Sequence, residues 1–139
     1  MADTTWVIDA QPLVAFIRRE AHWQRIGALI NATTRGEATL RLTAVNAGEV
    51  VLGTERALGA LVGHRALEMI QGWTDIVAVD LELGARAAWF KLRGGLSYAD
   101  CFAAALAHRD GLPLITGDPE FRQVEDVIRV VWLDTLPAA

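Results

Sequence analysis

Apolar and polar positions alternate with two different periods along the chain, which predicts strands and helices in turn. Short β-branched or apolar runs predict strands, and apolar residues three or four positions apart predict helices. Strands are expected at residues 6–8, 39–43, 76–79, 113–116 and 127–133, and helices at residues 13–20, 22–34, 44–52, 81–92 and 97–111. Residues 54–73 keep a helical spacing despite Gly59 and Gly63, so we expect one or two further helices there, packed as a hairpin.

This order of elements predicts the fold class. Strands that alternate with helices form a parallel sheet covered on both faces, with right-handed crossovers. We therefore expect an α/β protein, a three-layer α/β/α sandwich with a central, mainly parallel sheet. The 139 residues suit a single domain, residues 1–139, because no repeat or linker divides them.

Composition narrows the class of protein further. Hydrophobic residues make up 53% and charged residues 22%, which excludes a disordered chain, and no apolar run reaches the roughly 18 residues of a membrane span. The first residues carry neither the basic region nor the apolar run of a signal peptide. We therefore expect a cytoplasmic protein without a membrane partner.

Four acidic residues fall where predicted strands end or predicted helices begin: Asp9, Glu49, Asp100 and Asp118. In an open α/β sheet these ends converge on one crevice. Carboxylates about 5 Å apart would repel one another by roughly 3 kcal/mol per pair at an effective dielectric near 20. A site of this kind calls for a bound cation, and Mg²⁺ or Mn²⁺ prefers such oxygen ligands.

Each acid also has a structural interpretation that needs no ligand. Asp9 is a possible helix N-cap, and Asp100 is a possible third residue of a capping box begun by Ser97. Asp118 lies in a Gly-Asp-Pro turn, and Glu49 on a helix is ordinarily a solvated charge. Only the joint pattern of the four acids favours a metal site.

Other reactive side chains offer weaker candidates. His22, His64 and His108 are scattered over helical segments, which favours surface histidines over metal ligands. The lone Cys101 lies in an apolar helix and is interpreted as a buried thiol. The net charge of −4 argues against a nucleic-acid partner. This argument is weak, because bound metal reverses the local charge of a carboxylate cluster.

Four segments resemble the PIN domain, and most closely the VapC-type toxins of bacterial toxin–antitoxin pairs. They are Val-Ile-Asp at residues 7–9, Thr-Ala-Val-Asn-Ala-Gly-Glu-Val at 43–50, Leu-Ser-Tyr-Ala-Asp-Cys-Phe-Ala-Ala-Ala at 96–105, and Leu-Ile-Thr-Gly-Asp-Pro-Glu-Phe at 114–121. The last two segments are specific when taken together. The resemblance spans nearly the whole chain.

The resemblance implies a PIN-like fold and a metal-dependent endoribonuclease. It implies that Mg²⁺ or Mn²⁺ is held by the quartet Asp9, Glu49, Asp100 and Asp118, with Thr116 supporting the site through its hydroxyl. Glu120, two residues beyond Asp118, is an alternative that could take or share the role of Asp118, and Asp118 ranks first. An RNA substrate, a homodimer and a small protein antitoxin are also implied by the resemblance alone.

The sequence departs from the PIN-domain pattern at one place, and other classes of protein offer alternative functions. Ala10 and Gln11 follow the first aspartate, where such proteins often carry Ser or Thr. A PIN-like module that binds RNA or protein without cutting is the main alternative. A receiver domain built around Asp80 would need a lysine after the last strand, and an Asp-x-Asp phosphatase would need an acid where Gln11 stands.

Overall fold

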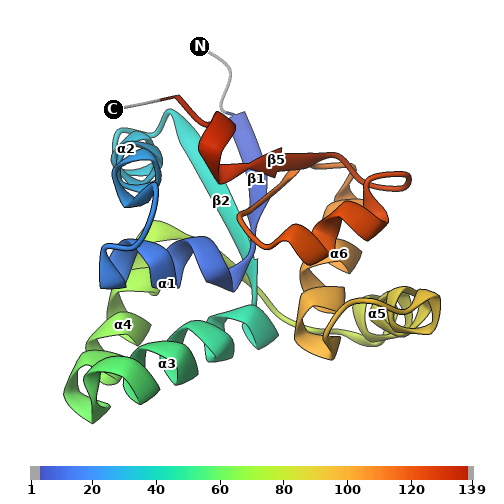
Figure 1. Cartoon of the computed structure of the whole chain (residues 1–139), viewed down its shortest axis with the longest axis horizontal. Coiled ribbons are helices and arrows are strands. Elements are labelled where there is room, and N and C mark those ends of the chain that lie inside the picture. Colours follow the sequence, from blue (N-terminus) through green and yellow to red (C-terminus); the bar gives the residue numbers. More distant parts are fainter. Residues whose placement is uncertain (1–3, 138–139) are drawn as a thin grey trace.

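Five strands form one parallel sheet in the computed structural model, which describes residues 4–137. They are β1 (Thr4–Ile8), β2 (Ala38–Thr43), β3 (Asp75–Val77), β4 (Leu114–Thr116) and β5 (Val130–Trp132). Their order in the sheet is β3-β2-β1-β4-β5, and each neighbouring pair is parallel (Figure 1). The parallel sheet predicted from the sequence is confirmed.

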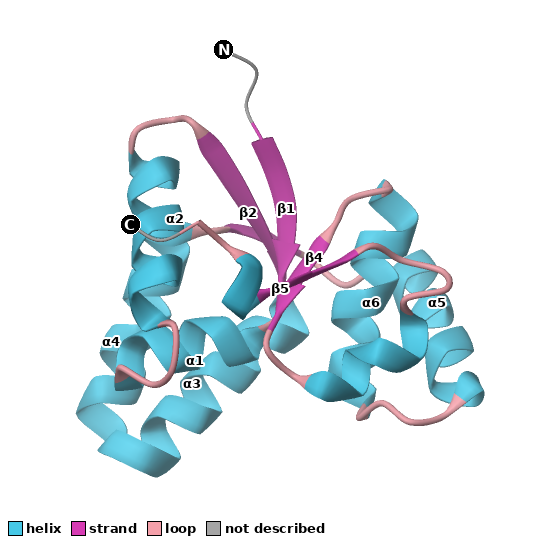
Figure 2. Cartoon of the chain, turned by 45° about the horizontal axis from the view of Figure 1, so that its top comes forward, coloured by secondary structure: helices cyan, strands magenta, loops and turns pink. Residues whose placement is uncertain are grey.

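Helices cover both faces of this sheet. They are α1 (Ala10–Arg18), α2 (Trp23–Thr34), α3 (Ala44–Leu58), α4 (Ala60–Trp73), α5 (Leu81–Arg93) and α6 (Tyr98–Asp110), with short 3₁₀ helices η1 (Pro119–Val124) and η2 (Leu133–Thr135). Helices α1 to α4 lie to one side of the sheet and α5 and α6 to the other (Figure 2). The α/β/α arrangement is therefore also as predicted.

The central strands are buried on both faces, which explains their continuous apolar runs. In β1, Val7 packs into the core beneath α5 and α6, whereas the next residue, Ile8, packs into the core beneath α1 to α4. Leu114 and Ile115 in β4 divide between the two cores in the same way. Two cores thus meet at β1 and β4, and the ends of these strands are held on both sides.

Several element boundaries differ from the sequence prediction, among them those of the helix predicted at 13–20, which is α1 and spans Ala10–Arg18. The last strand begins at Val130 rather than at 127, because the N–H groups of Val127 and Ile128 both donate to the carbonyl of Val124 and form a turn. The strand predicted at 76–79 is β3, which ends at Val77. The helix predicted at 44–52 continues to Leu58, where the chain turns at Gly59 with φ 94°.

Residues 54–73 hold the end of α3 and one further helix, α4, so the hairpin expected there is formed by α4 packing against α3 rather than by two new helices. Among the residues described, no helix combines the length and apolar character needed to cross a membrane. A single domain spanning residues 1–139 stays a prediction, and the two ends of that range lie outside the described residues.

Candidate metal centre

The carboxyl ends of the two central strands lie beside the first turns of α3 and α6. Asp9 directly follows β1, and Asp118 follows β4 by two residues, while Glu49 and Asp100 lie near the starts of α3 and α6. The sheet order reverses between β1 and β4, and such a point is where open α/β sheets place ligands. The strand ends and helix starts therefore place four acids at one edge of the sheet.

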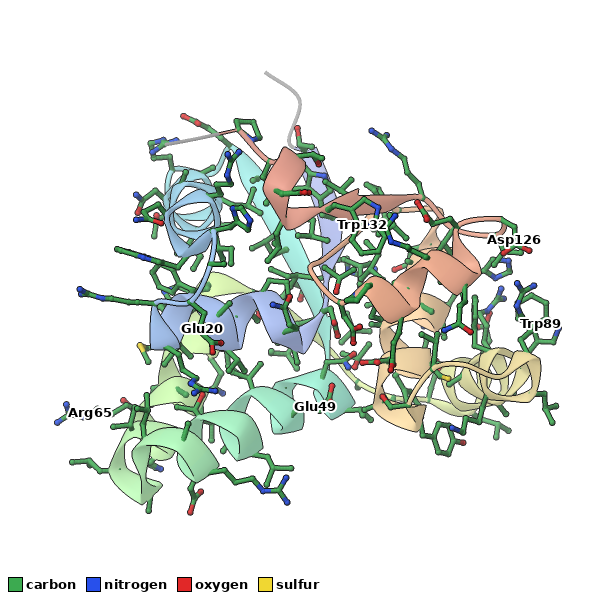
Figure 3. The ribbon with its side chains drawn as sticks, viewed as in Figure 1. Glu20, Glu49, Arg65, Trp89, Asp126 and Trp132 are labelled. Carbon is green, nitrogen blue, oxygen red and sulfur yellow. The ribbon has the colours of Figure 1, made fainter. Side chains whose placement is uncertain are left out.

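The acids lie in two overlapping groups that share Asp100. One carboxylate oxygen from each of Asp9, Glu49 and Asp100 lies within 4.8 Å of the others, and the same is true of Asp100, Asp118 and Glu120. They line a cavity of about 420 Å³ together with Gln11, Glu20 and Ser97. We call the five acids Asp9, Glu49, Asp100, Asp118 and Glu120 the acidic cluster. Figure 3 shows Glu49 projecting from α3 into the space beside α1.

Asp9 is the most buried member of the acidic cluster. It is the N-cap residue of α1, but its carboxylate makes no capping hydrogen bond. Instead Oδ2 accepts a hydrogen bond of 3.0 Å from the hydroxyl of Thr116, while Oδ1 is buried without a partner among residues 4–137. Burial first, and then the nearby charges of Asp100 and Glu49, raise the pKa of Asp9 to about 8.

Asp100 combines a capping position with a carboxylate directed at the acidic cluster. Its backbone N–H donates to the Ser97 hydroxyl at 3.2 Å, so Ser97 caps α6 as the capping interpretation requires. Burial raises the pKa of Asp100 to about 6, against the opposing effect of its hydrogen bond with Ser97. The cap therefore does not exclude a second role for this carboxylate.

Glu49 is half-buried and is held by an asparagine that the sequence analysis did not single out. The Nδ2 group of Asn46 donates to Glu49 Oε1 at 2.9 Å and to the carbonyl of Ala99 at 3.0 Å. The Thr43 hydroxyl donates to Asn46 Oδ1 at 2.5 Å and accepts from the Asn46 N–H at 3.0 Å. Burial raises the pKa of Glu49, and the Asn46 hydrogen bond opposes that rise.

The Thr116 hydroxyl links the two strand ends. It donates to Asp9 and accepts a hydrogen bond of 3.1 Å from the backbone N–H of Asp118. Asp118 Oδ1 in turn accepts from the N–H of Glu120 at 2.9 Å, which makes Asp118 the cap of η1. The turn interpretation of Asp118 therefore holds at the same time as its place in the acidic cluster.

Two further residues of this cavity were missed as site residues by sequence reasoning. Glu20 lies in the loop between α1 and α2, and its charge reaches the cavity although Arg18 lies 3.6 Å away (Figure 3). Gln11 Oε1 accepts a hydrogen bond of 2.9 Å from the N–H of Gly117. Gln11, two residues after Asp9, thus connects α1 to the loop after β4.

The other reactive side chains lie elsewhere in the described part of the chain. His64 lies 3.5 Å from Glu68 on α4, and His108 contacts Arg86 at 2.7 Å, both away from the residues that line the acidic cavity. His22 lies outside the groups of acids that could share an ion. Burial raises the pKa of the Cys101 thiol, which disfavours its nucleophilic thiolate form.

The acidic cluster has the chemistry of a site for a hard divalent cation. Its donors are all carboxylate oxygens, which Mg²⁺ and Mn²⁺ prefer, and the buried Asp9 Oδ1 lacks any other partner among the described residues. The raised pKa values of Asp9 and Asp100 reflect the cost of several anions in one enclosed place, and a cation would remove that cost. The residues present fit such an ion.

Comparison with known proteins gives a family match and several structures of similar fold. A family model described as PIN domain matches residues 6–127. No curated protein matches the sequence. A chain in the structure of VapBC-1 from nontypeable Haemophilus influenzae superposes with a TM-score of 0.69 at 13% identity, covering 95% of this chain and 100% of that chain.

Two more structures show the same fold. One is VapBC2 from Rickettsia felis bound to a DNA fragment from its promoter, with a TM-score of 0.70 at 9% identity, covering 93% of this chain and 98% of that chain. The other is VapC20 from Mycobacterium tuberculosis, described as a sarcin-ricin loop cleaving toxin, with a TM-score of 0.64 at 14% identity, covering 80% of this chain and 87% of that chain. At these identities the likeness establishes the fold.

Proposed function

The chain belongs to the PIN domain family, and from this premise we propose that it is a divalent-metal-dependent endoribonuclease, the toxin of a toxin–antitoxin pair. The observation that carries this proposal is the grouping of several carboxylates with Asp9, whose Oδ1 is buried without a partner within the described structure. Such an arrangement is costly to the fold unless a cation occupies it. A bound cation would offset the electrostatic cost of these enclosed carboxylates.

In this proposal Asp9, Glu49, Asp100 and Asp118 hold Mg²⁺ or Mn²⁺, and Glu120 shares the position of Asp118. Thr116 keeps Asp9 Oδ2 oriented, so that Oδ1 faces the ion. Asn46 is a positioning residue, because it fixes Glu49 Oε1 through a hydrogen bond while Thr43 fixes Asn46. These contacts lower the entropy that each carboxylate would lose on binding the ion.

The reaction is hydrolysis of an RNA phosphodiester. A water oxygen forms a bond to phosphorus and the bond from phosphorus to the 3′ oxygen breaks, which leaves 5′-phosphate and 3′-hydroxyl ends. The bound ion supplies positive charge at the phosphate and lowers the pKa of bound water. The chain's own carboxylates orient the ion, and no Ser-His-Asp set is needed.

The proposal of a toxin rests on the similar structures. Two of them contain VapBC assemblies, and the M. tuberculosis protein is described as a toxin that cleaves the sarcin-ricin loop. By that similarity we infer a protein antitoxin as partner, a homodimer and a cytoplasmic location. The second candidate function, a PIN-like module that binds RNA or protein without cutting, is disfavoured because all four acids are retained together.

The first experiment is calorimetric titration of Mn²⁺ into chelator-treated protein. We expect wild type to bind Mn²⁺, Asp9→Asn and Asp100→Asn to bind at least tenfold more weakly, and Glu68→Gln, an exposed acid on α4, to bind like wild type. Mn²⁺-dependent release of 5′-phosphate ends from RNA, stopped by chelator, then tests the reaction. Binding that is indifferent to Asp9 and Asp100 contradicts the proposed centre.

A further inference from the structure

A second cavity of about 240 Å³ adjoins the acidic cavity and shares Gln11 as a common wall. In two segments of the chain, neighbouring residues line different cavities, one the acidic cavity and the next the second cavity. Glu20 faces the acidic cavity and His22 the second cavity in one loop, while Asp118 and Pro119 divide in the same way after β4. A ligand that reaches from one cavity to the other would pass over Gln11.

The second cavity carries an arginine and an aromatic ring that are already stacked. The Arg122 guanidinium lies 4.8 Å from the centre of the Trp132 ring. Within residues 4–137, Arg122 forms no ion pair. Arg93, in contrast, pairs with Asp126, and Arg109 pairs with Asp110. Arg122 therefore presents a positive charge that no ion pair among the described residues holds, beside the acidic cavity.

The shape of the loop that borders this cavity is held in an uncommon conformation. His22 has φ 67° and Arg19 has φ 54°, so that both ends of the loop between α1 and α2 adopt the left-handed region without glycine. The Arg19 turn is explained by backbone hydrogen bonds to Ala15 and Phe16 that close α1. The exposed His22, on its left-handed turn, lines the second cavity, as Trp132 does.

We propose that this second cavity, lined by Gln11, His22, Arg122 and Trp132, is a subsite for one nucleotide of a single-stranded RNA, next to the bond that the acidic cluster would cut. This proposal rests on the proposed nuclease function and names its substrate contacts. Arg122 binds the neighbouring phosphate, and the base enters the cavity against the indole of Trp132. The cavity is smaller than the roughly 300 Å³ of a drug-sized pocket, which suits a single base.

The charges favour a nucleic acid in this position. The acidic cavity would repel an RNA backbone without its cation, so a fixed positive charge at its edge gives the strand a second attachment. His22 and Gln11 add hydrogen-bonding groups that can meet a base edge, and the Asp134 carboxylate on the same wall can accept from a base amino group. This set gives the subsite a preference among bases rather than charge alone.

Steady-state cleavage of a short RNA in saturating Mn²⁺ tests the assignment. We expect Arg122→Ala to raise KM at least tenfold with kcat within threefold of wild type. The slope of log KM against log salt should fall by about 0.7, the loss of one phosphate contact in a single strand. Arg65→Ala is the matched control, because it removes one exposed arginine from α4 on the far side of the molecule (Figure 3). Equal effects of the two substitutions overturn the phosphate contact.

The base contact is tested with an RNA library randomised around the cut. We expect Trp132→Leu and His22→Gly to change the base preferred beside the cleaved bond, while calorimetric Mn²⁺ binding stays like wild type. Glycine accepts the φ of 67° at position 22, so that His22→Gly removes the imidazole without disturbing the turn. Unchanged preference in both variants overturns the base subsite even when RNA is cut.

The outcomes separate the subsite from the function on which it rests. Wild type that binds no Mn²⁺ and cuts no RNA contradicts the proposed function itself. Wild type that cuts RNA with the same KM and base preference as Arg122→Ala and Trp132→Leu contradicts the subsite alone. Loss of antitoxin inhibition in these variants, with RNA cleavage unchanged, assigns the cavity to the protein partner and overturns the proposal.

Discussion

Asp118 accepts a hydrogen bond from the N–H of Glu120 and also lies within 4.8 Å of the Asp100 carboxylate. Ser97 and Asp100 combine a cap and a place in the acidic cluster in the same way. Local sequence rules predicted the Ser97 cap and the Asp118 turn correctly but not a side-chain cap from Asp9, and a cap uses one oxygen or one N–H and leaves the rest of a carboxylate free. At the scale of residues, the structural and the functional interpretations are therefore compatible.

The contacts that sequence reasoning missed are those between distant segments. Asn46 reaches the carbonyl of Ala99, and Glu20 enters the cavity through a loop whose path depends on two left-handed residues. The one local signal for Asn46 was its spacing, three residues after Thr43 and three before Glu49, which places the three side chains along one face of a helix start. Nothing in the sequence signalled Glu20.

The substitution Asp9→Asn should raise the stability of the metal-free protein. A neutral amide keeps the acceptor for Thr116 and removes a buried charge beside Asp100 and Glu49. We therefore expect the free energy of unfolding in chelator at pH 8 to rise by on the order of 1 kcal/mol or more, and Tm to rise with it. Mn²⁺ at 100 times the wild-type Kd should stabilise wild type by about 2.7 kcal/mol and Asp9→Asn, with its at least tenfold weaker binding, by no more than about 1.4 kcal/mol.

Thermal unfolding with chelator or with Mn²⁺ measures both effects. Glu68→Gln is the control, because it neutralises an exposed acid on α4 and should follow wild type in both conditions. A lower Tm for Asp9→Asn in chelator, or equal Mn²⁺ stabilisation of the two proteins, would contradict the electrostatic account of the cluster.

The substitution Asn46→Ala tests the support of Glu49. It removes the donor to the part-buried Ala99 carbonyl, leaves the buried Thr43 hydroxyl without its acceptor and frees Glu49, so we expect a loss of about 1–3 kcal/mol in the free energy of unfolding. Mn²⁺ affinity should fall by about 10-fold to 100-fold, as for other groups that orient metal ligands. Chemical denaturation and calorimetry measure these quantities, with the exposed Asn31→Ala on α2 as control. Wild-type Mn²⁺ affinity in Asn46→Ala would exclude a positioning role.

At the scale of elements, periodicity predicted the type of each strand and helix, and the boundaries moved where chain contacts overrode it. Helix α3 continues past the predicted end because α4 packs against its last turns, an interaction that the local pattern does not contain. The last strand shortened because residues 124–128 form a turn in spite of their apolar character. Tertiary packing thus decided where elements end.

The α3–α4 hairpin depends on a glycine at its contact. A Cβ atom added at Gly63 would lie 2.7 Å from Glu55 Cβ and 3.2 Å from Glu55 Cα on α3, so the helices could not keep their approach. We expect Gly63→Ala to cost about 1–3 kcal/mol, as overpacking does. Gly84→Ala in α5 is the control, because its Cβ meets nothing within 4 Å and should stabilise by about 0.5–1 kcal/mol through helix propensity.

Urea denaturation of these two variants gives opposite signs if the close approach is real. Destabilisation of both variants would instead indicate a general intolerance of helix substitutions. Since Glu49 lies on the same α3, Mn²⁺ titration of Gly63→Ala also reports whether the hairpin helps to place that carboxylate.

At the scale of the whole molecule, the acidic cluster lies where two cores join. Asp9 extends from β1, whose Val7 and Ile8 pack into opposite cores, and Thr116 closes β4 in the same position one strand away. The sequence predicted this convergence because parallel strands present their carboxyl ends at one edge. It could not predict how deeply Asp9 is buried, since burial depends on the helices that cover both faces.

That burial makes stability depend on pH in an unusual direction. Burial raises the pKa of Asp9 to about 8 and that of Asp100 to about 6, above the ordinary aspartate value of 3.8, so the folded protein holds protons that the unfolded chain has released. The metal-free protein should therefore lose stability as pH rises from about 4 to about 8, by on the order of a few kcal/mol. Mn²⁺ displaces these protons, so its stabilising effect should grow over the same range. Urea denaturation at pH 5, 6, 7 and 8, with chelator and with Mn²⁺, measures both trends, and Asp9→Asn should flatten the chelator curve. Metal-free stability that rises between pH 5 and pH 8 would show that the carboxylates are not held together in the folded protein.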